Sequence, residues 1–215
     1  MAAEYDFREG ERGKYALRYA EGAKVRVPNF HGQVLAVNRV ERLLRKATSA
    51  LDAAGLPYAV VGGNAVAAWV ATVDEGAVRA TKDVDILIRR PDLPAIADAL
   101  RAAGLISHEV LGVTMFLTRR KPNPKTGLHV VFAAEKVRPS DLHPAPELTA
   151  TVRSDSGFAV LSLPELVCMK LIAFRDIDRV HIRDLLSLSL IDDEVIAQLL
   201  PDLRERLREI QATPE

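Results

Sequence analysis

The sequence predicts a mixed α/β (α+β) fold, in which a half with both strands and helices precedes a helical C-terminal half. Three observations predict it. Short apolar runs bounded by glycine, proline or turn residues occur before residue 133 and are typical of buried strands. Apolar residues at three- and four-residue spacing lie between these runs and indicate helices. Beyond residue 163 only the helical spacing continues, so we expect helices there.

The first 36 residues differ from the rest because charged residues alternate densely along them. The stretch Ala23–Val27 alternates like a short strand, and Pro28 and Gly32 then break the pattern. We interpret residues 1–36 as an N-terminal arm without a core of its own. It is either a flexible or self-docking segment or a module that binds a partner.

Strands and helices are expected together between residues 37 and 138, which we predict to be the core domain. The first helix follows from apolar residues that recur from Val37 to Leu51, with Gly55 as its stop signal. Pro57 then opens a short apolar run that suits a buried strand. The expected elements are a helix over Val37–Leu51, a strand over Tyr58–Val61, a helix over Asn64–Val70, a strand over Val84–Ile88, a helix over Asp92–Ala103, and strands over Val113–Leu117 and Leu128–Phe132.

A proline-marked linker, Pro139–Pro146, follows the core. The helical pattern then predicts helices over Pro164–Phe174, Val180–Leu188 and Asp192–Leu207. We therefore predict a C-terminal helical region that spans residues 139–215.

Composition excludes a strong overall charge. Lys plus Arg equals Asp plus Glu at 29 each, so no global basic field indicates a nucleic-acid partner. The local run Arg119–Lys121, with Lys125, either contacts RNA phosphates or forms a solvated hairpin.

Several signals of other protein classes are missing from the sequence. It has no apolar stretch of membrane-helix length and no signal-peptide pattern. Its single cysteine, Cys168, cannot form an intramolecular disulfide, which fits a reducing cytosol. No Cys–His spacing of the zinc type occurs. We expect a cytoplasmic protein with no membrane partner and no zinc.

Two aspartates, Asp83 and Asp85, lie two residues apart on a predicted strand. Side chains two apart share a face, so both carboxylates point the same way while Val84 points into the core. Two adjacent carboxylates repel one another unless a cation lies between them, and oxygen ligands suit Mg²⁺ or Mn²⁺. The other interpretation of this pair is an ordinary solvent-facing strand edge.

A glycine turn, Gly62–Gly63 followed by Asn64, lies upstream between a predicted strand and a predicted helix. Glycines let the backbone approach a ligand closely, and the helix N-terminus offers free N–H groups to a phosphate. This order of elements favours a phosphate and metal site over two unrelated surface features.

The run Val61–Ala65 followed by Arg79–Asp85 resembles the signature of the polymerase-β nucleotidyltransferase superfamily. It is most similar to the AbiEii-type toxins of bacterial toxin–antitoxin systems, and the resemblance covers roughly residues 37 to 190. It implies a polymerase-β-type core, a mixed sheet flanked by helices. It also implies transfer of a nucleoside monophosphate from an NTP to an acceptor, with release of pyrophosphate.

The resemblance implies roles for individual residues. Asp83 and Asp85 would hold one or two Mg²⁺ or Mn²⁺ ions and act in catalysis. The nucleotide would be bound by the glycine turn and by the stretch before the aspartates, that is by Gly62, Gly63, Asn64, Arg79 and Thr81.

Lys170 and Asp184 resemble the lysine and aspartate that AbiEii-type enzymes carry on helices after the sheet. Lys170 would neutralise the β and γ phosphates, and Asp184 would position Lys170 or the nucleobase. An ammonium inside an apolar helix should face a cleft or an anion, although Lys170 could also snorkel at the helix edge. Asp184 could instead form an ion pair with a nearby arginine. His181 is interpreted as a surface or helix-packing residue.

One position departs from the superfamily pattern. Many active members carry a third carboxylate on a later strand, where this chain has His129. A neutral imidazole can ligate a metal or act as a base, and His129 is our candidate for the general base. Glu135, just past the strand, is a candidate substitute for the missing carboxylate.

These residues do not identify the acceptor. By resemblance it is a tRNA 3′ end, a protein hydroxyl or a small molecule such as an aminoglycoside, and a cognate antitoxin or toxin would be a partner. The alternative is a catalytically weak antitoxin or regulatory partner with the same fold, which the missing carboxylate favours.

Overall fold

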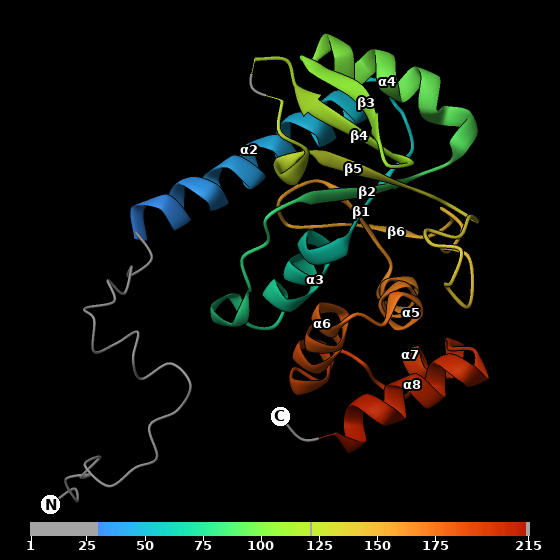
Figure 1. Ribbon diagram of the computed structural model, residues 1–215. Coiled ribbons are helices and arrows are strands. Elements are labelled where there is room, and N and C mark those ends of the chain that lie inside the picture. Colours follow the sequence, from blue (N-terminus) through green and yellow to red (C-terminus); the bar gives the residue numbers. More distant parts are fainter. Residues whose placement is uncertain (1–29, 121, 214–215) are drawn as a thin grey trace, which may run out of the picture. The chain divides into compact units, whose positions relative to one another are not determined.

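This computed structural model describes residues 30–120 and 122–213 of the chain. These residues contain a seven-stranded mixed sheet (Figure 1). The strand order is β3-β4-β5-β2-β1-β7-β6. Neighbours pair antiparallel except β2 with β5 and β1 with β7, which pair parallel. The strands are β1 (Ala59–Val61), β2 (Val84–Ile88), β3 (Leu105–Val110), β4 (Val113–Thr118), β5 (Leu128–Phe132), β6 (Thr151–Arg153) and β7 (Ala159–Leu161). The predicted α+β class with a mixed sheet is confirmed.

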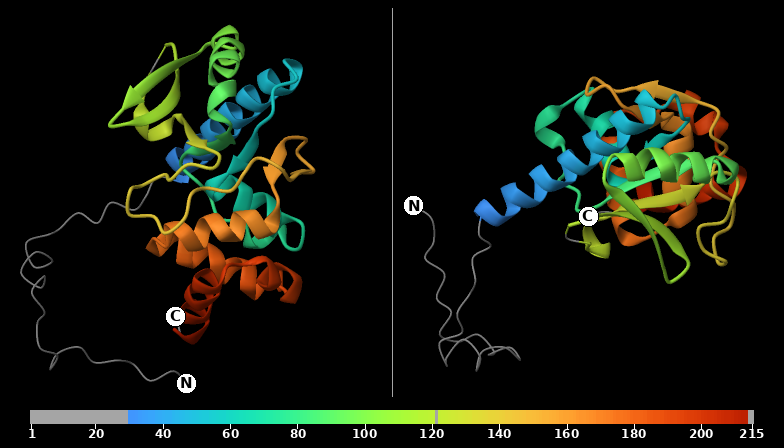
Figure 2. Two further views of the ribbon diagram at one scale, coloured as in Figure 1. Left: turned by 90° about the vertical axis from the view of Figure 1, so that its right-hand side faces the viewer. Right: turned by 90° about the horizontal axis from the view of Figure 1, so that it is seen from above.

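Helices cover the sheet and continue beyond it. Helix α4 packs on β3, whereas α5 to α8 gather on the opposite side of the described region (Figures 1 and 2). Helix α3 contacts β1, β2 and α6 and so joins the sheet to the C-terminal helices. The helices are α2 (Phe30–Ala53), α3 (Gly62–Ala71), α4 (Leu93–Ala102), α5 (Leu163–Ala173), α6 (Asp176–Ser187), α7 (Asp193–Gln198) and α8 (Pro201–Ala212), with short 3₁₀ turns η1 (Glu75–Ala77), η2 (Arg90–Asp92) and η3 (Pro124–Thr126).

Residues 35–215 form one compact unit, which contains the sheet and the cavity described below. Most of the predicted N-terminal arm, residues 1–29, lies outside the described residues. Helix α2 begins at Phe30, earlier than the predicted start at Val37, and Gly32 lies inside it. Val37 is 43% exposed, and among the residues of α2 whose burial is described Val40 is the first buried one. The three-part domain division remains a prediction.

Three strands were not predicted. In β3 only the first residue is fully buried, so this strand lacks an apolar run. Strands β6 and β7 have only three residues each, which is too short for a periodic pattern. Both strands lie within residues 139–215, which were predicted to contain only a linker and helices. They join the sheet because β7 pairs with β1 and β6 pairs with β7.

The single helix predicted over Asp192–Leu207 is wrong, because the chain leaves the helical conformation between α7 and α8. Leu199 and Leu200 have extended ψ angles of 145° and 153°. Pro201 explains the break: its ring disfavours the helical conformation at the preceding residue, and proline suits the first turn of a new helix. Among the described residues, no helix combines the length and apolar character needed to span a membrane.

Candidate active site

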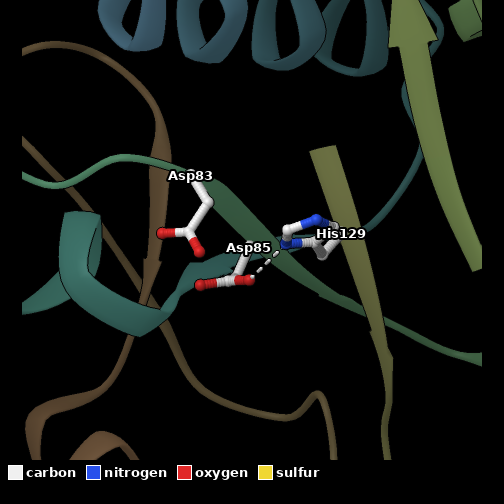
Figure 3. Close-up of side chains that lie close together, drawn as sticks. All are labelled: Asp83, Asp85 and His129. Atoms are coloured by element: carbon white, nitrogen blue, oxygen red, sulfur yellow. Dashed lines mark ion pairs between the residues drawn. The ribbon is translucent and has the colours of Figure 1, made fainter. Parts of the chain in front are cut away.

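Two carboxylates and an imidazole converge at the start of β2 (Figure 3). Asp83 immediately precedes β2 and Asp85 lies within it, while Val84 between them is fully buried. The predicted orientation of the pair is thus confirmed. The parallel pairing of β2 with β5 places His129 opposite Asp85. One ligand atom from each of the three side chains lies within 4.8 Å of the others.

The hydrogen bonding of His129 fixes its preferred tautomer. Its Nε2 lies 3.1 Å from the Pro124 carbonyl oxygen. A carbonyl only accepts, so Nε2 carries the hydrogen and the lone pair of a neutral ring lies on Nδ1. Nδ1 lies 3.4 Å from Asp85 Oδ1, which is also an acceptor. This contact is favourable only when a proton or a cation lies between the two atoms. Accordingly the pKa of His129 is above its ordinary value, chiefly because of its hydrogen bond to Asp85.

The donor set fits a divalent cation. Carboxylate oxygens suit Mg²⁺ and Mn²⁺, and a neutral imidazole nitrogen suits transition metals. Metal-ligating histidines usually donate their other ring N–H to a carbonyl or carboxylate, as His129 does to Pro124. Asp83, Asp85 and His129 are therefore able to hold one metal ion together.

Glu135 does not supply the missing carboxylate, and that expectation is wrong. Its carboxylate binds Arg90 in a two-point ion pair, with Arg90 Nη2 at 2.6 Å from Oε2. Arg90 also stacks on Phe132, 3.7 Å from the ring centroid. The hydrogen bond from Arg90 lowers the pKa of Glu135, which remains charged and committed to this pair. Glu135 does not belong to the group of possible metal ligands.

The glycine turn lies directly against the carboxylates. Gly62 has a φ of +66°, and a Cβ at this position would overlap Asp85 Oδ2. A Cβ on Gly63 would lie only 2.9 Å from Thr81 Oγ1. Only residues without a Cβ fit this close approach. Helix α3 starts here without a side-chain cap, so its first N–H groups remain available to an anion.

Asn64 has a different place from the two glycines. Its side chain is buried, and Nδ2 donates to the Asp83 carbonyl oxygen at 2.7 Å. Asn64 does not line the cavity that the other candidate residues share. It ties the start of α3 to the aspartate segment, so the geometry supports a positioning role more than the predicted contact with the nucleotide.

A cavity of about 800 Å³ brings the remaining candidates together. This volume is in the range of small-molecule sites. Five acidic and five basic side chains line it, so the formal charge of its lining is balanced. The predicted site residues among its lining are Gly62, Gly63, Arg79, Thr81, Asp83, Asp85, His129, Lys170 and Asp184.

Lys170 is buried and does not snorkel, with 5% of its side chain exposed. Its Nζ lies 2.9 Å from Asp178 Oδ1, so the ammonium faces both an anion and the cavity, as expected. Arg175 Nε donates to the other oxygen of Asp178 at 2.6 Å. Burial alone would raise the pKa of Asp178, but the bonds from Arg175 and the charge of Lys170 outweigh it and hold this pKa below its ordinary value.

Asp184 pairs with Arg79 and not with Lys170. Arg79 Nε and Nη2 donate to the two carboxylate oxygens at 2.7 and 3.0 Å. The expectation that Asp184 positions Lys170 is therefore wrong, since Asp178 does so, whereas a contact of Asp184 with the nucleobase stays a prediction. Asp184 instead joins α6 to Arg79, itself a candidate for nucleotide binding.

Sequence reasoning missed several polar residues of this cavity, among them Asp178 and His181. His181 was interpreted as a surface or helix-packing residue; it is only 9% exposed and lines the cavity, so the surface alternative is wrong. Burial lowers its pKa to about 4. A signal was present in the sequence: Asp178, His181 and Asp184 recur at three-residue steps, which places them on one face of α6.

This chain matches one known protein family and is similar in fold to solved structures. Residues 42–209 match the model of a family described as the nucleotidyl transferase AbiEii toxin of a type IV toxin–antitoxin system. The solution structure of the antibiotic-resistance factor ANT(2″)-Ia is similar in fold, with a TM-score of 0.51 at 15% identity over 82% of this chain and 95% of that one.

Two crystal structures show a weaker similarity. ANT(2″)-Ia in complex with adenylyl-2″-tobramycin has a TM-score of 0.46 at 17% identity over 81% of this chain and 99% of that one. An antigenic nucleotidyltransferase-like protein from Paracoccidioides brasiliensis has a TM-score of 0.45 at 15% identity, over 83% and 86% of the two chains. No protein with curated function matches this chain.

Proposed function

We propose, for a chain that belongs to the AbiEii nucleotidyltransferase family, that nucleotidyl transfer from an NTP to a hydroxyl acceptor depends on a divalent metal ion at Asp83 and Asp85. One observation carries the metal dependence. Two carboxylates and an imidazole nitrogen meet beside the uncapped start of α3, on the wall of a cavity large enough for a nucleotide. When bound, the metal would neutralise phosphate charge and polarise the transferred phosphoryl group.

The charge balance of the cavity supports this dependence. Because the acidic and basic side chains of the lining are equal in number, the protein alone offers no net attraction to a triphosphate. Asp83 and Asp85 would even repel it. A cation at these carboxylates reverses the local sign and makes triphosphate binding favourable.

The protein's own phosphate contacts would come from two directions. The N–H groups at the start of α3 face the carboxylate side, where Gly62 and Gly63 allow close approach. Lys170 provides a positive charge from α5, held in place by Asp178. The acceptor oxygen would attack the α-phosphorus while the bond to the β-phosphate breaks and pyrophosphate leaves.

His129 fits the role of metal ligand better than that of general base, our expectation from the sequence. The Pro124 carbonyl occupies Nε2, and Nδ1 points at Asp85. No ring nitrogen is left over to remove a proton from the acceptor. A neutral nitrogen ligand also favours Mn²⁺ over Mg²⁺, which prefers a shell of oxygens.

The acceptor and the biological partner rest on the family alone. Its description as a type IV toxin–antitoxin component supports a toxin that acts in the cytoplasm and has a cognate antitoxin. Among acceptors we favour a tRNA or a protein hydroxyl. The alternative of a catalytically weak antitoxin depended on the missing carboxylate, and the position of His129 among the possible ligands weakens that argument.

Transfer of a radiolabel tests this function directly. The protein is incubated with each α-labelled NTP, Mn²⁺ or Mg²⁺, and either total tRNA or cell-extract protein. We expect one labelled band with one class of acceptor, and a loss of about a thousandfold in Asp83→Ala, roughly 4 kcal/mol of transition-state stabilisation. A variant that keeps most of the wild-type rate would overturn the role of this carboxylate. Nucleotide binding without any labelled product would instead support the regulatory alternative.

A further inference from the structure

His181 has an unmet hydrogen-bonding capacity inside the cavity. The residue is 9% exposed, and its Nδ1 is fully buried without a partner. Neither ring nitrogen forms a hydrogen bond with any described residue. Buried polar side chains in folded proteins nearly always have partners, and an unpaired one costs about 1–3 kcal/mol. Such an imidazole in a cavity wall indicates a hydrogen bond that forms only when a ligand is bound.

The position of His181 indicates which part of a ligand it meets. Its Cε1 lies 3.9 Å from the point that a Cβ on Gly63 would occupy, and Thr81 Oγ1 lies 2.9 Å from the same point. His181 and Thr81 therefore both lie against Gly63 in the first turn of α3. The free N–H groups of this turn form the phosphate site of the proposed function.

The surroundings of the ring determine its charge. Burial and the nearby charges of Lys170 and Arg175 disfavour an imidazolium, and Asp178 and Asp184 oppose them only in part. The ring is therefore neutral near pH 7, with one N–H to donate and one lone pair. A neutral ring contacts an anion as a hydrogen-bond donor and does not add to the charge of the site.

We propose that His181 is a substrate-binding residue that donates a neutral hydrogen bond to a phosphate oxygen of the NTP at the Gly62–Gly63 turn. This inference rests on the proposed function, because it takes the nucleotide to bind with its phosphates at that turn. A neutral donor orients the triphosphate without the charge attraction that would retain pyrophosphate after transfer. This separates His181 from Lys170, which contributes charge to the same cavity.

Binding measurements on variants of the full chain test the proposal. We would titrate wild type and the variants with an α,β-methylene NTP, which cannot be transferred, and with the corresponding nucleoside, which has no phosphate, in the presence of Mn²⁺. His181→Phe keeps a ring but removes the donor, and we expect NTP affinity to fall about tenfold or more. His181→Gln keeps a neutral N–H and should stay within about threefold of wild type. His108→Phe, an exposed histidine on β3, is the matched control and should bind like wild type.

Each result has one meaning. His181→Phe that is folded and binds the NTP like wild type would overturn the role of His181, as would an equal loss in His181→Phe and His181→Gln. Should phenylalanine not fit, His181→Leu replaces it under the same criteria. The nucleoside serves as a further readout, because a purely structural defect would weaken both ligands alike, whereas loss of a phosphate contact would weaken only the NTP. If wild type itself binds no NTP, the proposed function fails, whereas normal wild-type binding with unaffected variants removes only this inference.

Discussion

Lys170 and Asp178 place opposite charges in the interior, with 5% and 1% of their side chains exposed. Sequence reasoning could predict that Lys170 needs an anion, because an ammonium in an apolar helix is otherwise too costly. It could not predict which one. Several aspartates of α6 were within reach, and the choice depends on how α5 and α6 are rotated against each other, which no local pattern encodes.

Removal of Asp178 should therefore destabilise the fold strongly. Asp178→Ala would leave the buried Lys170 without its partner, and breaking a buried pair from one side typically costs about 3–5 kcal/mol. Asp184→Ala is the matched control, because its ion pair with Arg79 is largely at the surface and should contribute about 0–1 kcal/mol. Urea denaturation gives both free energies of unfolding. Equal and small losses in the two variants would contradict the assigned importance of the buried pair.

His181 predicts a pH dependence of stability. In the unfolded chain an imidazole takes up a proton below about pH 6.5, whereas the folded ring has a pKa of about 4. Between these values the unfolded state binds more protons, so the free energy of unfolding should fall as the pH falls, by up to roughly 3 kcal/mol. Denaturation at pH 7, 6, 5 and 4 measures this slope. His181→Phe should flatten it, and an identical slope in wild type and variant would exclude His181 as its source.

Strand β2 and the start of helix α3 meet at the glycine turn beside Asp85. Helix α3 can approach Asp85 only because Gly62 adopts a left-handed φ and lacks a Cβ. The sequence predicted this turn, because two glycines between a strand and a helix let the backbone adopt conformations that other residues disfavour. The bounds of β2 and β5 also agree with the prediction, because every residue of these strands is apolar except Asp85 and His129.

Short strands and one helix break escaped prediction. Strand β7 consists of three buried residues, and it joins the sheet only because β1 lies next to it. The break between α7 and α8 was visible as Pro201, yet the apolar spacing continues across it. Pairing with β1 determines β7, and the backbone restriction of Pro201 determines the break between α7 and α8. The periodic pattern that identified the other helices and strands contains neither signal.

At this junction we expect Gly62→Ala to abolish transfer activity. The added methyl group would displace the Asp85 carboxylate, and the left-handed φ adds about 1 kcal/mol of strain. Gly55→Ala is the control, because Gly55 has a similar φ of +63° and no atom lies within 4 Å of the point that its Cβ would occupy. Both variants should lose stability in thermal melts because of the left-handed φ, and Gly62→Ala should lose more because of the overlap with Asp85, but only Gly62→Ala should lose activity. An active Gly62→Ala enzyme would contradict the close approach.

For the molecule as a whole, the sheet and the C-terminal helices supply opposite halves of one cavity. The proposed metal ligands come from β2, from Asp83 just before it and from β5, whereas the ammonium of Lys170 comes from α5 and its partner Asp178 from α6. The ion pair between Arg79 and Asp184 connects the two halves. The sequence predicted most members of the cavity but few of their pairings, because membership follows from motif and pairing follows from three-dimensional packing.

Metal removal tests this arrangement on the intact protein. We expect chelation with EDTA to abolish transfer, and Mn²⁺ to restore it at lower concentration than Mg²⁺, because His129 offers a nitrogen ligand. His129→Asp replaces the nitrogen by oxygen and should shift the preference toward Mg²⁺. The ratio of half-maximal metal concentrations is the measurement. An unchanged ratio in His129→Asp would argue against direct ligation by His129.

The parallel pairing of Asp85 with His129 also predicts which changes in β5 would remove activity without preventing folding. A one-residue deletion in β5 would turn His129 away from the site, and the same slip would move the buried Leu128 and Val130 to the other face of the strand. Such a deletion would remove the proposed metal ligand and the core contacts together. We therefore expect that β5 variants that fold but lack activity carry a substitution at His129. Variants with a residue deleted from this strand should fail to fold.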